Sequence, residues 1–291
     1  MDTLRVLAGK NIIITGASRG LGAVIAETMW KAGANLMLVD KDQEALSKVV
    51  SGLGQPHQQT SFPFIIDLSA PNAAELILKS AQERFDHLDI LVNNAAIQGP
   101  VGASWDNDWS SWNLTLTVDL LTPVDLSRRC AAWMILSGKG KIISLSGGGA
   151  TGSRPNFSAY AVAKTGLVRF CEILADELRP HHIQVNCIAP GVMSTAILDE
   201  ILTAGPERAG QNEYDSALKV RQHGGTPPQR VTDLAVFLAS EASDGITGKL
   251  ISAVWDPWEH FPEHLEDLQK TDIYTLRRII PKDRGQLWGG V

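Results

Sequence analysis

Residues 11–22 read NIIITGASRGLG, and this stretch decides the fold. A short run of isoleucines predicts a buried strand, a turn with three glycines follows, and the chain from about Leu21 predicts a helix. Gly16 allows the tight turn, while Gly20 and Gly22 let the backbone approach a pyrophosphate and let the helix pack on the strand. A helix N-terminus attracts phosphate through its free N–H groups and its dipole. The stretch therefore predicts a dinucleotide-binding turn, with an ordinary strand-to-helix turn as the weaker alternative.

A second apolar run follows over residues 36–39 and ends at Asp40. An acidic residue roughly 20 positions after the glycine turn is placed to bind a ribose 2′-hydroxyl. The same carboxylate would repel a 2′-phosphate, so Asp40 predicts NAD in preference to NADP. Arg19 and Lys41 lie close enough in the sequence to weaken that repulsion. The alternative is that Asp40 caps the next helix.

Strands and helices alternate along most of the chain. Further apolar runs predict strands over residues 62–66, 88–92, 142–145, 183–188 and 250–254, with helices between them. Alternation of this kind is typical of a parallel sheet covered by helices on both faces. We therefore predict an α/β fold with one doubly wound parallel sheet of about seven strands. A long helix, broken in character by Pro123, is expected over residues 109–137, and a polar, mobile-looking segment is expected over residues 194–228.

The stretch from Lys141 to Lys164 reads KIISLSGGGATGSRPNFSAYAVAK. Tyr160 and Lys164 are four residues apart on a predicted helix, so they share one face. A tyrosine with a pKa near ~10 ionises more easily when a cation is close. This pairing predicts that Tyr160 is a general acid/base and that Ser146, at the end of the preceding strand, holds a substrate oxygen. Taken alone, such a pair is weak evidence, because many helices carry a packed tyrosine beside a solvated lysine.

Taken together, these features resemble the short-chain dehydrogenase/reductase family over about residues 8–254. The matching motifs are TGASRGLG over residues 15–22, Asn93-Asn94-Ala95, Ser146, Tyr160-x-x-x-Lys164 and Pro190-Gly191. The resemblance implies a Rossmann-type sheet, a nicotinamide cofactor and hydride transfer between an alcohol and a carbonyl. It implies that Tyr160 moves the proton and that Ser146 binds the substrate oxygen. Lys164 would lower the pKa of the tyrosine and hold the nicotinamide ribose.

The resemblance also implies which residues bind NAD. At the glycine turn and the second strand these are Gly16, Ser18, Arg19, Gly20, Leu21, Gly22 and Asp40. Asp67 and Leu68 would contact the adenine, and Asn93 and Ala95 the adenosine ribose. Pro190, Gly191 and Val192 would meet the carboxamide, Thr195 a phosphate, and Tyr160 with Lys164 the nicotinamide end. No metal site is expected.

The first departure from the family pattern is Asp119, where the family has an asparagine. In the family, the backbone carbonyl of that residue holds a water that relays protons to the lysine. A helical carbonyl at 119 would accept from the N–H of residue 123, and Pro123 has none. We therefore expect a free carbonyl and a surviving relay, and we count Asp119 among the catalytic residues. Its carboxylate would shift the pH optimum if it lies close to Lys164; the alternative is an acid on the helix surface.

The second departure is the spacing before Tyr160. Ser146 precedes it by fourteen residues, one more than the family's commonest gap, so Gly147 is the competing alignment. The third departure is the end of the chain, because the last strand lacks its usual Val-Asp-Gly-Gly ending. A catalytic domain of residues 1–254 is expected, followed by an extension of residues 255–291 that packs on the same domain or on a neighbouring subunit.

Apolar side chains in this extension predict an ordered segment. A helix is expected after Pro262, with Leu265 and Leu268 on one face. Because the seventh strand ends at the sheet edge that holds the site, we expect the tail near the substrate mouth of its own or a neighbouring subunit. A contact between subunits without a part in the site is the alternative.

Composition limits the remaining choices. Of 291 residues, 44% are hydrophobic and the net charge is −6, which gives no argument for a nucleic-acid partner. No apolar run approaches the ~20 residues of a membrane span. The N-terminus lacks the pattern of a signal peptide, and three cysteines without metal or redox spacing fit a reducing cytoplasm. The partner is expected to be a small alcohol or carbonyl, and the polar segment 194–228 favours a hydroxylated one.

Two other functions stay open. A sugar-nucleotide epimerase or dehydratase shares the Tyr/Lys pair, but such enzymes are usually longer and space their glycines differently. A cofactor-binding sensor or scaffold without catalysis is suggested only by Asp119. Apolar residues on more than one face of the helices around 114–134 and 157–178 predict a homo-oligomer, a tetramer or a dimer.

Overall fold

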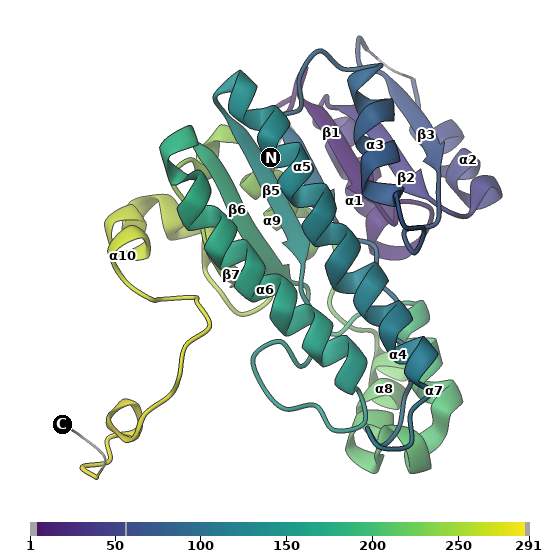
Figure 1. Cartoon of the computed structure of the whole chain (residues 1–291), viewed down its shortest axis with the longest axis vertical. Coiled ribbons are helices and arrows are strands. Elements are labelled where there is room, and N and C mark those ends of the chain that lie inside the picture. The colour runs from purple at the N-terminus through teal and green to yellow at the C-terminus, as the bar shows by residue number, and fades with distance from the viewer. Residues whose placement is uncertain (1–4, 56, 289–291) are drawn as a thin grey trace.

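Seven parallel strands form one sheet in the computed structural model, which describes residues 5–55 and 57–288. The order across the sheet is β3-β2-β1-β4-β5-β6-β7 (Figure 1). The strands are β1 (Asn11–Thr15), β2 (Asn35–Asp40), β3 (Ser61–Ile65), β4 (Ile90–Asn93), β5 (Gly140–Leu145), β6 (Ile183–Ala189) and β7 (Leu250–Ser252). The order reverses direction between β1 and β4, so the predicted doubly wound, Rossmann-type sheet is confirmed.

Helices cover both faces of this sheet (Figure 1). One face carries α1 (Gly20–Lys31), α2 (Gln43–Gly52) and α9 (Pro228–Ala239), and the other carries α3 (Ala73–Gln82), α5 (Thr122–Ser137) and α6 (Ser158–Leu178). Side chains along β1 point alternately to the two faces of the sheet, and each face is covered by its own layer of helices. Ile12 and Ile14 belong to the cluster with α1 and α9, whereas Ile13 belongs to the cluster with α3, α5 and α6. Strands buried on both faces read as continuous apolar runs for this reason.

The predicted long helix over residues 109–137 is present, and it is interrupted next to Pro123 as expected. It consists of α4 (Trp109–Leu116), a π-helical turn (Thr117–Leu121) and α5. The division lies immediately before Pro123. A proline has no N–H for the carbonyl four residues earlier, and its ring would collide with that carbonyl. A π turn, which widens the helix locally, is a structure that accommodates such a site.

The polar segment over residues 194–228 is largely helical, which its polar composition did not indicate. It contains two helices, α7 (Ala196–Ala209) and α8 (Gln211–His223), which lie with α4 at one end of the molecule (Figure 1). The polar side chains face outward, and the sparse apolar ones form a small cluster of their own. Leu198, Ile201 and Ala217 pack there against Phe157, which is completely buried.

The tail begins by packing on its own domain. A 3₁₀-helix (Trp258–His264) precedes α10 (Leu265–Lys270), so the predicted helix after Pro262 is present. Trp258, Phe261 and Leu268 are buried in the α1–α9 cluster. Trp258 packs against Phe237 of α9, with ring centroids 5.4 Å apart.

The tail then covers the open edge of β7. The Leu250 N–H donates to the carbonyl of Tyr274 at 2.8 Å, and Lys249 Nζ donates to the carbonyl of Ile273. Covering an edge in this way hides backbone groups that would otherwise pair with another strand. Residues 277–288 leave the body as an arm (Figure 1), and residues 289–291 of the predicted extension lie outside the described part. Within the described residues, no helix is long and apolar enough to span a bilayer.

Candidate active site

A cavity of about 860 Å³ opens at the carboxyl ends of the strands. Most of the predicted site residues line it. They are Gly16, Arg19, Gly20, Leu21, Gly22, Asp40, Asp67, Leu68, Ala95, Ser146, Tyr160, Lys164, Pro190, Gly191, Val192 and Thr195. Parallel strands bring their carboxyl ends to one edge, which is why residues far apart in sequence meet there. No residue of the described tail lines the cavity, so the expected position at the mouth of its own subunit is wrong.

The glycine turn has the shape that a phosphate cradle needs. Gly16 has a φ of +67°, and a Cβ there would lie 2.6 Å from the Cα of Ala95. Gly22 is packed even more closely, because a Cβ would lie 2.0 Å from the carbonyl oxygen of Gly16. Gly20 has a φ of +53° and faces open space. The turn is thus closely packed at Gly16 and Gly22 and open at Gly20. It presents the N-terminus of α1 to the cavity, which fits a dinucleotide.

Asp40 lies at the end of β2, on the wall of the cavity. Its carboxylate accepts from the N–H of Ser18 at 3.1 Å and from the N–H of Asp42 at 3.1 Å. Asp42, whose carboxylate accepts from Ala45, caps α2, so the alternative reading of Asp40 as a helix cap does not hold. Arg19 is paired with Asp42 at 2.9 Å. Arg19, the basic residue within the glycine turn, is therefore already paired with a carboxylate.

Two predicted cofactor residues do not line the cavity. Asn93 turns into the core, where its amide donates to Ser127 Oγ at 2.9 Å. Ser18 is buried, and its hydroxyl has no partner in the described chain. Asn94, which belongs to the matching motif but was given no role in the site, lines the cavity, and its amide donates to the carbonyls of Thr15 and Gly16. Asn94 therefore holds the glycine turn from below.

Tyr160 and Lys164 lie one turn apart on α6, as predicted. Both are buried, and Lys164 Nζ lies 5.5 Å from the centroid of the Tyr160 ring. Lys164 Nζ also donates to the carbonyl of Leu145 at 3.1 Å. A lysine has three donors, so this contact fixes the ammonium and leaves others for the site.

The expected lowering of the Tyr160 pKa is reversed in this structure. Burial raises the pKa of Tyr160, Lys164 lowers it, and Asp119 raises it again. The net direction is upward, because burial disfavours the phenolate. Burial opposes the charged form of Lys164 too, yet Asp119 and Tyr160 outweigh it and the pKa of Lys164 is raised. Lys164 is therefore a cation at neutral pH.

The competing alignment at Gly147 is visible in the geometry. A Cβ on Gly147 would lie 2.3 Å from Tyr160 Oη, so the tyrosine hydroxyl occupies the space of a side chain at 147. Ser146 follows β5, lines the cavity, and has a buried hydroxyl without a partner in the described chain. The position that faces Tyr160 Oη thus has no side chain, and the hydroxyl of the preceding residue, Ser146, makes no hydrogen bond to the tyrosine.

Asp119 lies behind the cavity and not on its wall. Its side chain is completely buried, which excludes the reading as an acid on the helix surface. Oδ1 accepts from the N–H of Ile97 at 2.9 Å, and Oδ2 lies 3.5 Å from Lys164 Nζ. Burial raises the pKa of Asp119, against the pull of Lys164.

A second group of charged side chains also lines the cavity, and no sequence motif connects its members. Arg154 makes two hydrogen bonds to Glu213 of α8, at 3.1 and 2.9 Å, and stacks on Phe157. Glu200 of α7 lines the same region. Arg154 and Glu213 are 59 residues apart, so no local pattern could connect them.

Comparison with known proteins agrees with this architecture. The family model described as Enoyl-(Acyl carrier protein) reductase matches residues 16–253. The human protein "Dehydrogenase/reductase SDR family member 4" is 28% identical over 245 residues, which cover 84% of this chain and 86% of that protein.

Two solved structures with bound cofactor share the fold. One is an NAD+-bound xylitol dehydrogenase (TM-score 0.75, 23% identity, covering 84% of this chain and 98% of that one). The other, from Escherichia coli CFT073, is complexed with NADPH (TM-score 0.73, 25% identity, covering 86% and 98%). Neither of the two alternative functions is favoured by these matches. The chain belongs to the short-chain dehydrogenase/reductase family of oxidoreductases.

Proposed function

We propose that this oxidoreductase transfers a hydride between NAD and an alcohol or carbonyl substrate, with Tyr160 as the general acid/base. The observation that carries the proposal is that Tyr160 and Lys164 line the same cavity as the glycine turn. A bound nicotinamide cofactor supplies or accepts the hydride. The chain itself binds the substrate oxygen and moves its proton at Tyr160 Oη.

The proton step follows from the neighbours of Tyr160. Tyr160 takes the proton from the substrate hydroxyl during oxidation and returns it during reduction. Lys164 favours the phenolate from one turn away on the same helix. Ser146 is the second contact to the substrate oxygen, because its buried hydroxyl is free within the described chain. The backbone carbonyl of Asp119, to which Pro123 cannot donate, is the relay toward Lys164.

Asp40 makes NAD the preferred cofactor in this proposal. Its carboxylate lies on the cavity wall and is fixed by the N–H of Ser18. It would accept a hydrogen bond from a ribose 2′-hydroxyl and repel a 2′-phosphate. A charge-assisted hydrogen bond contributes roughly 1.5–3 kcal/mol, which is about 10- to 150-fold in affinity. Lys41 offers little relief, since it lies 3.5 Å from Asp67.

The substrate we propose is small and hydroxylated. The cavity is also lined by Arg154, Glu200, Glu213 and Ser216, which offer both donors and acceptors to hydroxyl groups. Leu114 and Ile201 add apolar wall.

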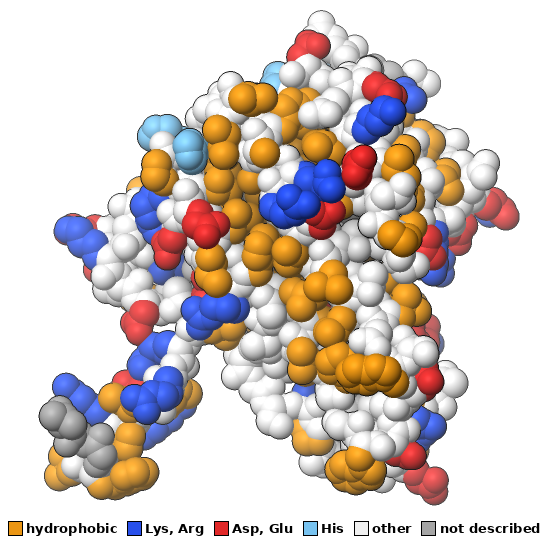
Figure 2. All heavy atoms as spheres, in the orientation of Figure 1, with side chains coloured by type: hydrophobic (Ala, Val, Ile, Leu, Met, Phe, Trp, Pro, Cys, Tyr) orange, Lys and Arg blue, Asp and Glu red, His pale blue; other side chains and the backbone are white. Residues whose placement is uncertain are grey.

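The working form we propose is a homo-oligomer. Leu121, Val162 and Ile173 are exposed on the α4–α6 face. Figure 2 shows hydrophobic side chains together over these helices. The arm over residues 277–288 also carries exposed Ile279, Leu287 and Trp288 among lysines and arginines (Figure 2). Apolar patches of this kind are typical of contacts between subunits.

A substrate panel tests the proposed function. Polyols, simple alcohols and ketones would be offered with NAD or NADH, and with the phosphorylated cofactors for comparison, while nicotinamide absorbance is followed. We expect turnover of at least one polyol or ketone, faster with NAD(H). Absence of any hydride transfer by a folded, NAD-binding protein would overturn the proposal.

A further inference from the structure

The carboxylate of Asp119 lies behind the Tyr160–Lys164 pair, and the proposed function makes no use of it. Its oxygens are differently engaged. Oδ1 accepts from the N–H of Ile97, whereas Oδ2 faces Lys164 Nζ and has no hydrogen bond in the described chain. A fully buried carboxylate is costly unless it is paired, so its position beside Lys164 requires an explanation.

Two segments hold this carboxylate in place. Asp119 belongs to the π-helical turn Thr117–Leu121, and π turns are frequent at functional sites. Ile97 belongs to the segment after β4 that lines the cavity. Asp119 therefore joins the cavity wall to the turn, and only one of its oxygens is left for Lys164.

The ammonium of Lys164 is correspondingly constrained. One of its three donors goes to Leu145, and a second faces Asp119 Oδ2 at 3.5 Å. A third is left for a ligand in the cavity. An asparagine at 119 could accept from Ile97 equally well but would bring no charge to Lys164, so the charge is the property that distinguishes this site.

We propose that Asp119 is a positioning residue whose carboxylate fixes the Lys164 ammonium and offsets its charge at the Tyr160 hydroxyl. The inference rests on the proposed role of Tyr160 as acid/base. Its consequence is that Tyr160 ionises at higher pH than it would beside an uncharged residue 119. Alcohol oxidation, which needs the phenolate, is then favoured in alkaline solution, while carbonyl reduction extends over neutral pH.

The other polar groups around the pair and Asp119 come from three elements and a loop. They are Arg154 on the β5–α6 loop, Glu213 on α8, Glu200 on α7 and Cys187 on β6. Arg154 favours the phenolate, with its guanidinium 5.9 Å from the Tyr160 ring centroid. Glu213 pairs with Arg154 and weakens that effect. Asp119 is the acid closest to Lys164, and its removal leaves both cations acting on Tyr160.

Tyrosinate absorbance tests the inference without any substrate. The chain has three tyrosines, Tyr160, Tyr214 and Tyr274, so subtracting the titration of Tyr160→Phe isolates the first. We expect Asp119→Asn to lower the ionisation midpoint of Tyr160 by about one pH unit, as expected for removal of a nearby buried charge. An unmoved or raised midpoint would overturn the proposal. If Asp119→Asn does not fold, Asp119→Ser provides the same comparison.

Asp125→Asn is the matched control. Asp125 lies on α5, outside the cavity, and pairs with Arg129 at 3.0 Å. Its substitution by asparagine removes the same charge as Asp119→Asn does. Its midpoint is expected to equal that of the parent. Asp119→Asn should also keep its affinity for NAD, and its pH optimum for oxidation should move to lower pH once a substrate is known.

These readouts separate the two proposals. Failure to find a substrate would remove the proposed function but not affect the titration. A parental midpoint in an Asp119→Asn enzyme that turns over substrate would remove only the role of Asp119.

Discussion

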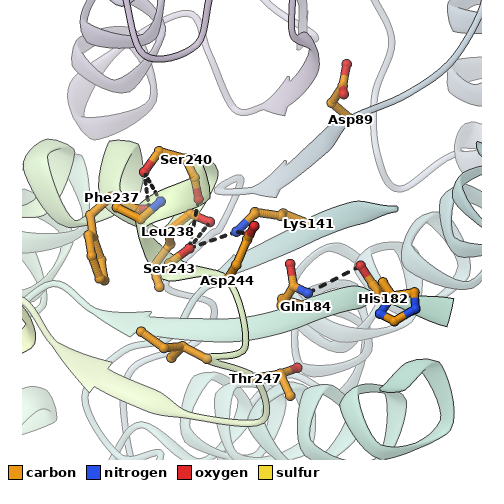
Figure 3. Close-up of polar contacts among 12 residues, drawn as sticks. Asp89, Lys141, His182, Gln184, Phe237, Leu238, Ser240, Ser243, Asp244 and Thr247 are labelled. Atoms are coloured by element: carbon orange, nitrogen blue, oxygen red, sulfur yellow. Dashed lines mark hydrogen bonds and ion pairs between the residues drawn. The ribbon is translucent and has the colours of Figure 1, made fainter. Parts of the chain in front are cut away.

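The amino ends and the carboxyl ends of the strands each carry a cavity lined with charged residues, but the polar atoms around the two cavities are satisfied to different degrees. At the amino ends of the strands, a cavity of about 370 Å³ is lined by Lys10, Asp89, Lys141 and Asp244. Figure 3 shows Lys141 reaching Ser243 Oγ at 2.9 Å and Asp244 at 2.7 Å. Asp89 accepts from the N–H of Asn11 and pairs with Lys10.

At the carboxyl ends, by contrast, several buried polar atoms are left over. The hydroxyls of Ser18 and Ser146 and one oxygen of Asp119 lack hydrogen bonds in the described chain. An unsatisfied buried group costs about 1–3 kcal/mol, so a fold retains it where a ligand completes it. Buried polar atoms without partners, and not the number of charges, therefore distinguish the carboxyl ends of the strands from the amino ends.

Tyr160→Phe should have the largest effect, because it removes the proton carrier from the cavity at the carboxyl ends of the strands. The ring still packs on α6, so the fold and the affinity for NAD are retained while turnover falls by about 10²–10⁴-fold. Initial rates and calorimetric titration with NAD would measure the two properties. A variant that kept more than a tenth of the parental rate would show that another group moves the proton.

Lys164→Ala should be almost as damaging but in a different way. The change removes the cation beside Tyr160 and a donor that faces the cavity, so turnover and NAD affinity should both decrease. The same two measurements apply. Unchanged NAD binding would mean that Lys164 acts on Tyr160 alone.

Asp40→Ala should change cofactor choice without stopping the reaction. Loss of the carboxylate removes a hydrogen bond to the 2′-hydroxyl and a repulsion against the 2′-phosphate, so a gap of about 10- to 150-fold should narrow. Dissociation constants for NAD and NADP, measured on parent and variant, would decide this. Equal affinities in the parent would already contradict the proposed preference.

Truncation after Leu276 should lower the number of subunits in the oligomer and leave the rest of the chain folded. Residues 258–276 keep their packing on α9 and their bonds along β7, whereas the exposed arm is removed. Light scattering at micromolar concentration should report a smaller mass. A parental mass would assign the subunit contacts to the α4–α6 face.

Lys141→Met at the amino ends of the strands should have the smallest effect. Asp244, its partner, is largely exposed, and exposed or replaceable ion pairs contribute little to stability. We expect a free energy of unfolding within about 1 kcal/mol of the parent and an unchanged turnover. A large loss of activity would mean that the cavity at the amino ends of the strands takes part in function, although its charges are paired.

Features set by local spacing could be predicted from the sequence. The glycine turn, Asp40 after β2 and the pair Tyr160–Lys164 each depend on neighbours within one strand–turn–helix unit. These are the features that the structure brings to one cavity. Local sequence has the information to define them because each is a short segment with one allowed geometry.

Features set by helical phase or by long-range packing could not be predicted. A π turn adds a residue to the helical register, so the sequence alone does not decide which side of the helix Asp119 occupies. The bond between Arg154 and Glu213 depends on how α8 folds over the cavity. The path of the tail over its own subunit could not be predicted either, because it depends on where Trp258 and Phe261 find room beside α9.

The covered edge of β7 has a consequence for how the protein is made. The cluster that Ile12 and Ile14 begin is completed by Phe261 and Leu268, which a ribosome adds long after them. Until then, the last strand has neither its neighbour on the open side nor the apolar residues that support α9. The domain therefore closes only after Leu268 has emerged, and the growing polypeptide must remain soluble with an unfinished sheet in the meantime.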